Sequence, residues 1–157
     1  MLSRFLMSII VFTSLALPLA TVRAGESVAV GDIRLETAWA RASIGTSRPA
    51  AAYLTIVNVG TKRDRLVRVE TPVADKAEIH ETVMTDGVMK MRPAGIIDIP
   101  AGGRVRLAPG GLHIMLMGLR APLKKGGTVR LTLLFERNGR GTITARIAGP
   151  GARKPPQ

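Results

Sequence analysis

The residues of this chain best suited to chemistry lie between His80 and Met117. This stretch contains both histidines of the protein and five of its seven methionines. The five methionines are Met84, Met89, Met91, Met115 and Met117. From His80, through one methionine and the second histidine, the spacing is H-x10-M-x21-H-x-M, ending at Met115. Imidazole and thioether groups concentrated in this way indicate a metal site.

The donor types favour a soft monovalent metal. Thioether sulfur is polarizable and uncharged, so two thioethers with two imidazoles suit Cu(I) far better than Mg²⁺, Ca²⁺ or Mn²⁺, which prefer oxygen. Zinc competes for the imidazoles, but its usual protein ligands are Cys, His and carboxylate. We therefore expect Cu(I) as the bound ion.

Strand alternation supports a ligand role for three of the four donors in this spacing, which are His80, His113 and Met115. In residues 112–117 the aliphatic side chains alternate with His113, Met115 and Met117, which places those three on the face away from the core. In residues 78–84, Ile79 and Val83 are expected inside, so His80 and Met84 share the opposite face. Three side chains of ligand type that face away from the core in residues 112–117 indicate a bound metal or a protein partner.

The alternation of Met91 does not support a ligand role. Met89 and Met91 share a face opposite Lys90 and Arg92, which by itself is typical of a core face. Met89 is expected in the core or just behind the ligands. Whether Met84 or Met117 joins the site stays open, because four donors already complete a tetrahedron.

The elements that carry these residues are short strands, and no convincing amphipathic helix interrupts them. Ten alternating runs are expected at 33–36, 52–59, 65–69, 78–84, 88–92, 96–99, 104–107, 112–117, 129–136 and 142–147. Turn residues separate them, such as Asp86-Gly87 and Asn138-Gly139. Many short strands with such turns predict an all-β sandwich or barrel, in a single domain.

The same stretch resembles the PCuAC family of periplasmic copper chaperones. The resemblance rests on E-I-H-E-T-V-M-x-D-G-V-M-K-M-R-P at 78–93 and P-G-G-L-H-I-M-L-M-G-L at 109–119, and it extends to W-A-R-A-S at 39–43 and A-A-Y-L-T-I-V-N at 51–58. It implies a cupredoxin-like sandwich with Greek-key connections. It also implies that Met91 completes a Cu(I) site with His80, His113 and Met115.

The resemblance further implies a carrier rather than an enzyme. The expected acceptor is the dinuclear copper A centre in subunit II of cytochrome c oxidase, a haem-copper oxidase, reached directly or through a thiol-bearing assembly protein. A periplasmic monomer is expected. Two alternatives stay open: a copper store or scavenger for copper homeostasis, and a metal-free β-sandwich acting as an interaction module.

Composition removes several other classes. The chain has no cysteine, which excludes disulfides, thiol redox chemistry and a blue-copper site, since that site needs a Cys thiolate. Its formal charge of +12 favours acidic partners. Nucleic acid is not expected, because the basic residues are scattered and no aromatic stripe accompanies them. No cluster of bases or phosphate-binding loop suggests an enzyme.

The two ends of the chain differ from its centre. Residues 1–24 read as a secretory signal peptide, with Arg4 before an apolar run and small residues around Arg23. Cleavage would leave no membrane span and would remove two of the 23 basic residues, leaving 21 against 11 acidic ones, or +10. An uncleaved anchor is the alternative. Residues 25–148 form the expected copper-binding domain, and 149–157, rich in Pro and Gly, are expected to be disordered.

Overall fold

The computed structural model describes residues 27–156, and within them every regular element is a strand. The strands are β1 (Ser27–Val30), β2 (Ile33–Arg41), β3 (Ala50–Asn58), β4 (Asp64–Glu70), β5 (Ala74–Thr85), β6 (Val88–Pro93), β7 (Ile97–Ile99), β8 (Arg104–Leu107), β9 (His113–Leu119), β10 (Thr128–Phe135) and β11 (Gly139–Ala148). The all-β prediction is confirmed. All ten expected runs appear as strands, and β1 is an addition. The expected signal peptide lies outside the described residues.

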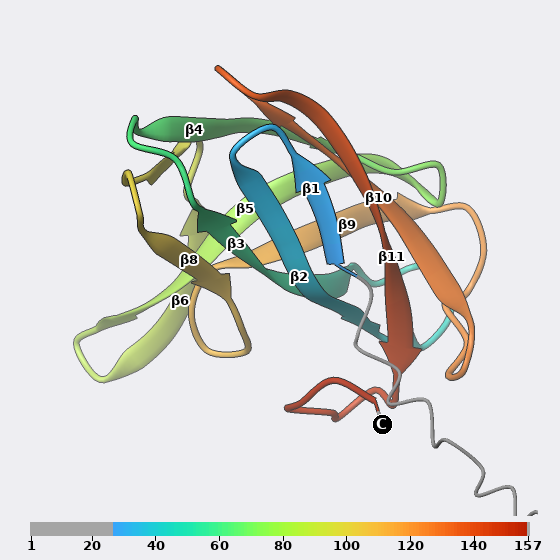
Figure 1. The fold of residues 1–157 in the computed structure, drawn as a ribbon. Helices are drawn as coiled ribbons and strands as arrows, with labels where there is room; N and C mark the ends of the chain where they lie inside the picture. The colour runs from blue at the N-terminus through green and yellow to red at the C-terminus, as the bar shows by residue number, and fades with distance from the viewer. Residues whose placement is uncertain (1–26, 157) are drawn as a thin grey trace, which may run out of the picture.

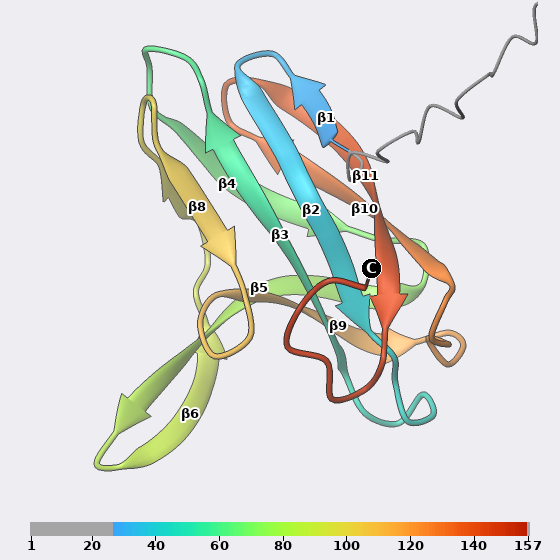
Figure 2. The same ribbon diagram turned by 60° about the horizontal axis from the view of Figure 1, so that its bottom comes forward.

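One continuous sheet forms the molecule. Its hydrogen-bonded order is β6-β5-β9-β3-β2-β11-β10-β4-β7, with β1 on β2 and β8 on β3. The sheet curls around its main core, so that β4 returns beside β5, as Figures 1 and 2 show. Within the part of the chain described, no helix has the length and apolar character needed to cross a membrane.

The core consists of aliphatic side chains from the inward positions of nearly every strand. Ile33, Leu54, Ile114 and Leu131 are all at most 1% exposed and belong to it. Because the sequence has few aromatic residues, branched aliphatic residues fill the interior. These residues pack well on the pleated, buried surface of a sheet. This core holds β5 and β9 side by side, and those two strands carry both histidines.

A bulge in β2 changes which side chains face the core. Thr37 has a positive φ of 55°, and the pairing with β3 shifts register between Glu36 and Trp39. Leu35 lies in the main core before the bulge and Ala40 after it. Trp39 is therefore turned to the other face, where it packs on Tyr53, with ring centroids 4.4 Å apart. Trp39 is 4% exposed, so it is buried in this second cluster instead of the main one.

The C-terminal segment covers this second cluster. Ala152 packs against Trp39 and Tyr53, and its carbonyl oxygen accepts a hydrogen bond from Arg41 Nε at 2.8 Å. Figure 2 shows the segment after β11 curling beneath the end of β2. These contacts tie Ala152 to the folded domain, and the disorder expected for 149–157 stays a prediction.

The β5–β6 hairpin projects away from the curled sheet (Figures 1 and 2). Its two-residue turn has positive φ at both Asp86 (51°) and Gly87 (77°), the backbone that Asp-Gly turns favour in hairpins. β6 is the edge strand, and all its residues are exposed. The hairpin therefore presents its side chains to solvent beyond the core.

Candidate metal centre

The two histidines lie directly opposite each other. His80 on β5 pairs with His113 on β9 in the antiparallel register, and their ring centroids are 6.1 Å apart. Residues opposite each other in a sheet share one face, and here the neighbouring side chains Ile79 and Ile114 point into the core. Both imidazoles therefore lie on the outer face, as the alternation predicts.

The methionines of β9 lie on that same face. Leu116 is fully buried in the core, whereas Met115 and Met117 are half-buried on the other side. Met115 pairs with Ala51 of β3 on one flank and with Glu78 of β5 on the other. The alanine leaves room beside the thioether, so Met115 is accessible next to His113.

Met91 reaches the site from the edge strand. It pairs with Thr82, two residues along β5 from His80, and its side chain is 62% exposed. Met89, on the same face of β6, is 66% exposed. The expectation that Met89 lies in the core fails, because no other layer formed by residues 27–156 covers the projecting hairpin.

A cleft of about 390 Å³ joins these side chains. Its lining includes Met89, Met91, His113 and Met115, together with residues of the segment between β2 and β3. His80 is beside His113 rather than in the lining itself. Three of the four expected ligands thus share one cleft, and the fourth is paired across the strands with one of them.

The ring of His113 is held by its own chain. His113 is 5% exposed, and its Nδ1 lies 2.9 Å from the carbonyl oxygen of Gly111, which also accepts a bond from the Thr82 amide at 3.3 Å. A carbonyl can only accept, so Nδ1 carries the proton in this contact. The lone pair is then on Nε2, and the tautomer is set for binding a metal through that nitrogen.

A carboxylate approaches His80 from the same strand. His80 Nε2 is 3.4 Å from Glu78 Oε2, a long contact, while Glu81 instead binds Arg92 at 2.7 Å on the opposite face. Hydrogen bonds from Lys76 and then from His80 hold the pKa of Glu78 below its ordinary value. Glu78 is therefore an ionised neighbour that can orient the His80 ring. Glu78 is two residues from His80 on β5, so strand alternation puts both on one face.

The charged side chains of the cleft are both arginines, Arg41 and Arg48. The guanidinium of Arg41 lies 5.6 Å from the ring centroid of Tyr53. Burial raises the pKa of Tyr53 above its ordinary value, and the positive charge of Arg41 partly offsets that rise. Positive charge therefore lies beside His113 and the methionines of the cleft, whereas the ionised Glu78 lies beside His80.

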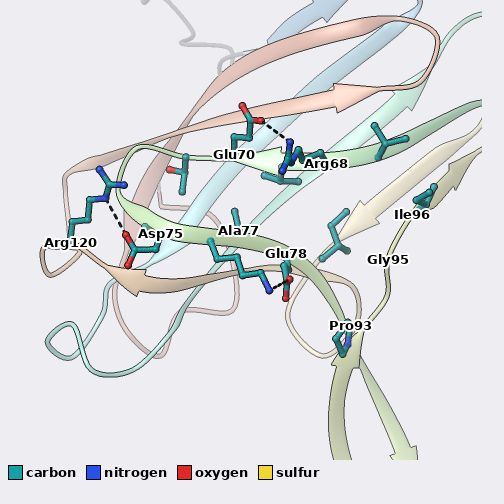
Figure 3. A pocket seen from close by; sticks show the side chains of 15 residues that line it. Arg68, Glu70, Asp75, Ala77, Glu78, Pro93, Gly95, Ile96 and Arg120 are labelled. Atoms are coloured by element: carbon teal, nitrogen blue, oxygen red, sulfur yellow. Dashed lines mark ion pairs between the residues drawn. The ribbon is translucent and has the colours of Figure 1, made fainter.

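A larger cleft, of about 560 Å³, lies between β4, the start of β5 and the segment after β6 (Figure 3). Its charged side chains pair with one another, as Arg120 does with Asp75 at 3.5 Å and Arg68 with Glu70 at 3.8 Å. None of the four expected ligands lines it. Within residues 27–156, no group of three or more His, Cys, Asp or Glu side chains is arranged to hold a metal.

Sequence comparison identifies the family. Residues 33–147 match the family described as "Putative lipoprotein LpqE-like". "Putative lipoprotein Lxx21020" of Leifsonia xyli subsp. xyli is 38% identical over 105 residues, which are 66% of this chain and 62% of that protein. "Uncharacterized protein RP573" of Rickettsia prowazekii is 30% identical over 114 residues, covering 70% and 63%. The chain thus spans less than two thirds of the length of these two relatives.

Solved structures agree with this assignment. The copper-bound PCuAC domain from PmoF2 has a TM-score of 0.67 and 30% identity, covering 80% of this chain and 99% of that domain. The solution structure of CuI-DR1885 from Deinococcus radiodurans has a TM-score of 0.56 and 32% identity, covering 83% and 86%. The expected cupredoxin-like fold and the family resemblance are both confirmed. The chain belongs to the LpqE-like family, and its fold is that of the PCuAC domains.

Proposed function

We propose that this protein is a copper chaperone of the cell envelope that carries one Cu(I) ion as cargo. The observation that carries the proposal is the pairing of His80 with His113 beside a cleft that Met91 and Met115 line. Two imidazoles and two thioethers form a neutral, soft donor set, which suits Cu(I). Related domains of known structure include a copper-bound one and a CuI-bound one.

The exposure of the proposed ligands fits carriage rather than storage. His113 is buried and fixed by Gly111, whereas Met91 stands 62% exposed on a projecting hairpin. A ligand set with one firmly held end and one open end lets an acceptor approach the ion from the side of Met91. Thioether sulfur also binds Cu(I) without the charge attraction of a thiolate, so a Cys-bearing acceptor has the higher affinity for the ion.

The proposed acceptors are thiol-bearing copper proteins of the same compartment. We propose the copper A centre in subunit II of cytochrome c oxidase, or an assembly protein that feeds it, because Cys thiolates win Cu(I) from neutral donors. The name of the Leifsonia relative supports an envelope location. The expected secretory signal points the same way, towards the periplasm. Carriage of copper requires no chemical conversion by the protein, so the proposed function is not enzymatic.

Anaerobic competition for Cu(I) against a calibrated chelator tests the binding step. The proposal predicts one tightly bound ion per chain and a loss of tenfold or more, about 1.4 kcal/mol, for Met115→Leu. Met117→Leu is the matched control, since Met117 lies on the same strand and face and is also half-buried, and its affinity should stay within about twofold, or ~0.4 kcal/mol. Equal losses in the two variants would argue against a defined site.

A transfer experiment then separates a chaperone from a store or scavenger. Loaded protein is mixed with an excess of a Cys-containing copper A fragment, the two are separated, and copper is measured in each. A chaperone gives up its copper to the fragment. Copper retained on the His/Met protein against excess acceptor would favour the store or scavenger, and failure to bind copper at all would favour a metal-free interaction module.

A further inference from the structure

The exposed large hydrophobic side chains of this protein are concentrated at the tip of one hairpin. Eight such residues are present within residues 27–156, and four of them belong to β5 and β6. The four are Met84, Val88, Met89 and Met91, each more than half exposed. A solvent-exposed strand pair has no packing need for three thioethers, so their presence calls for a ligand or a partner.

Two of these methionines form a direct cross-strand pair. Met84 pairs with Met89 at the last rung but one before the Asp86-Gly87 turn, and each side chain is 66% exposed. Side chains directly opposite each other in an antiparallel pair have Cβ atoms about 4.5–5.5 Å apart on one face. Methionine has three rotatable bonds, so both sulfur atoms can turn towards an ion held between them.

The pair is continuous with the proposed copper site. Residues 80, 82 and 84 of β5 share one face, so the Met84–Met89 rung lies one same-face step beyond the Thr82–Met91 rung. Such a step is about 7 Å along a strand, which is within reach of a long flexible side chain. Met89 and Met91 both line the cleft that holds His113 and Met115. A row of thioethers thus leads from the tip to the buried imidazole.

We propose that Met84 and Met89 form a second, weaker site for a soft monovalent cation, which serves as the entry and exit point for the copper site. This proposal deepens the proposed function and rests on it for the identity of the cargo. Two neutral thioethers do not satisfy hard divalent ions, which require several oxygen ligands, so the tip selects soft ions. Two donors in place of four, without imidazole, make this site the weaker of the two.

Silver titration with methyl NMR tests the second site directly. Ag(I) is a soft monovalent ion that does not change oxidation state, and selective ¹³C labelling of methionine methyl groups gives each thioether its own signal. The first equivalent should shift the Met91 and Met115 methyl signals. Beyond one equivalent, the Met84 and Met89 signals should shift together, with an affinity at least tenfold weaker. Signals at the tip that stay unmoved at several equivalents would overturn the proposal.

Leucine substitution shows whether the two methionines act as one site. In Met84→Leu, the Met89 signal should lose its response to the second equivalent, whereas the response of Met91 and Met115 to the first should remain. Met117→Leu is the control and should leave all four responses intact. A Met89 response that survives Met84→Leu would overturn the paired site. A tip used only for docking a protein would give no silver response in the wild type, and that result would also overturn the proposal. Leucine keeps the tip apolar, so Met84→Leu removes a sulfur atom without removing such a docking surface.

The same titration keeps the two proposals apart. Loss of the first-equivalent response at Met91 and Met115 with a normal tip response would count against the proposed copper site alone. A normal first equivalent with a silent tip would count against the second site alone.

Discussion

His80 and His113 are direct partners in the pairing of β5 with β9, with ring centroids 6.1 Å apart and ring planes at 51°. The register of that pairing sets the site. A slip of one residue in either strand would turn one imidazole into the core and bring an aliphatic neighbour out. The packing of Ile79 and Ile114 in the core opposes such a slip. The aliphatic core thus fixes the relative position of the two imidazoles on the opposite face, which are proposed metal ligands.

The bond between His113 and Gly111 predicts a single imidazole tautomer before any metal binds. With Nδ1 donating to the carbonyl at 2.9 Å, the metal-free protein should carry its proton on Nδ1 and leave Nε2 bare. Long-range ¹H–¹⁵N correlation spectra of the two histidine rings measure this, with His80 as the internal comparison because its carboxylate contact is longer. A His113 ring protonated on Nε2 alone would contradict the assigned bond.

The arginines of the cleft predict docking that depends on charge. Arg48 is exposed and lines the cleft, so Arg48→Glu should slow copper transfer to an acidic acceptor while leaving copper affinity unchanged. Raising the salt from 0.1 M to 1 M shortens the Debye length from about 10 Å to about 3 Å, so transfer by the wild type should also slow. Stopped-flow mixing at several salt concentrations gives the rates.

Arg130→Glu is the matched control for that charge reversal. Arg130 is also exposed, but it lies on β10, four places from β9 in the sheet order. Its reversal should therefore leave the transfer rate nearly unchanged. Equal slowing by both reversals would show that net charge, rather than the cleft, governs encounter.

The C-terminal segment predicts a local stability effect around Trp39. Ending the chain at Gly149 removes the Ala152 carbonyl from Arg41 and uncovers the Trp39–Tyr53 cluster. Loss of one charge-assisted hydrogen bond and a small apolar contact should lower the free energy of unfolding by about 1–2 kcal/mol. Since the chain has one tryptophan, its emission reports on this site alone and should shift to longer wavelength.

A chain that ends at Arg153 is the control for this truncation, because it keeps Ala152. Its emission and stability should match those of the full-length protein. If the chain ending at Gly149 also matched, the segment would contribute nothing to the ordered domain.

Asp64 predicts a loss of stability in acid. Burial raises the pKa of this carboxyl, but hydrogen bonds from Asn138, Arg137 and Arg65 outweigh burial and place the pKa below its ordinary value. A carboxyl whose pKa is lowered on folding stabilises the protein above its unfolded pKa of about 3.9. This stability is lost as pH falls through the lower, folded value.

Urea unfolding at several pH values measures this contribution. Asp64→Ala leaves several partly buried donors without an acceptor and should lower the free energy of unfolding by about 3 kcal/mol at pH 7. Its stability should fall less than that of the wild type between about pH 5 and pH 2. Parallel pH profiles for the two proteins would show that Asp64 is not the titrating group.

The sequence predicts those features of the site that follow from strict alternation. His113, Met115 and Met117 lie on the face opposite to that of Ile114 and Leu116, because β9 alternates regularly over residues 113–117. The turn at Asp86-Gly87 is equally predictable, because Asp-Gly is a pair that favours two-residue hairpin turns with positive φ at both positions. Regular local rules thus located the histidines and the hairpin.

Irregular and non-local features could not be predicted in this way. The bulge at Thr37 moved Trp39 out of the main core, and an alternating pattern contains no sign of an inserted residue. The exposure of Met89 depends on whether another layer covers the hairpin, which its own residues do not encode. Covering of Trp39 by Ala152 is a contact between the two halves of the chain and is likewise invisible to local patterns.

X-ray absorption at the copper K-edge tests the proposed ligand set most directly. The protein is loaded anaerobically with one equivalent of Cu(I), and the nearest scattering atoms are counted. The account predicts both sulfur and nitrogen around the ion in the wild type, and loss of the sulfur shell when Met91 and Met115 are both replaced by leucine. A first shell without sulfur in the wild type, or one with undiminished sulfur in the double variant, would contradict a site built from His80, Met91, His113 and Met115.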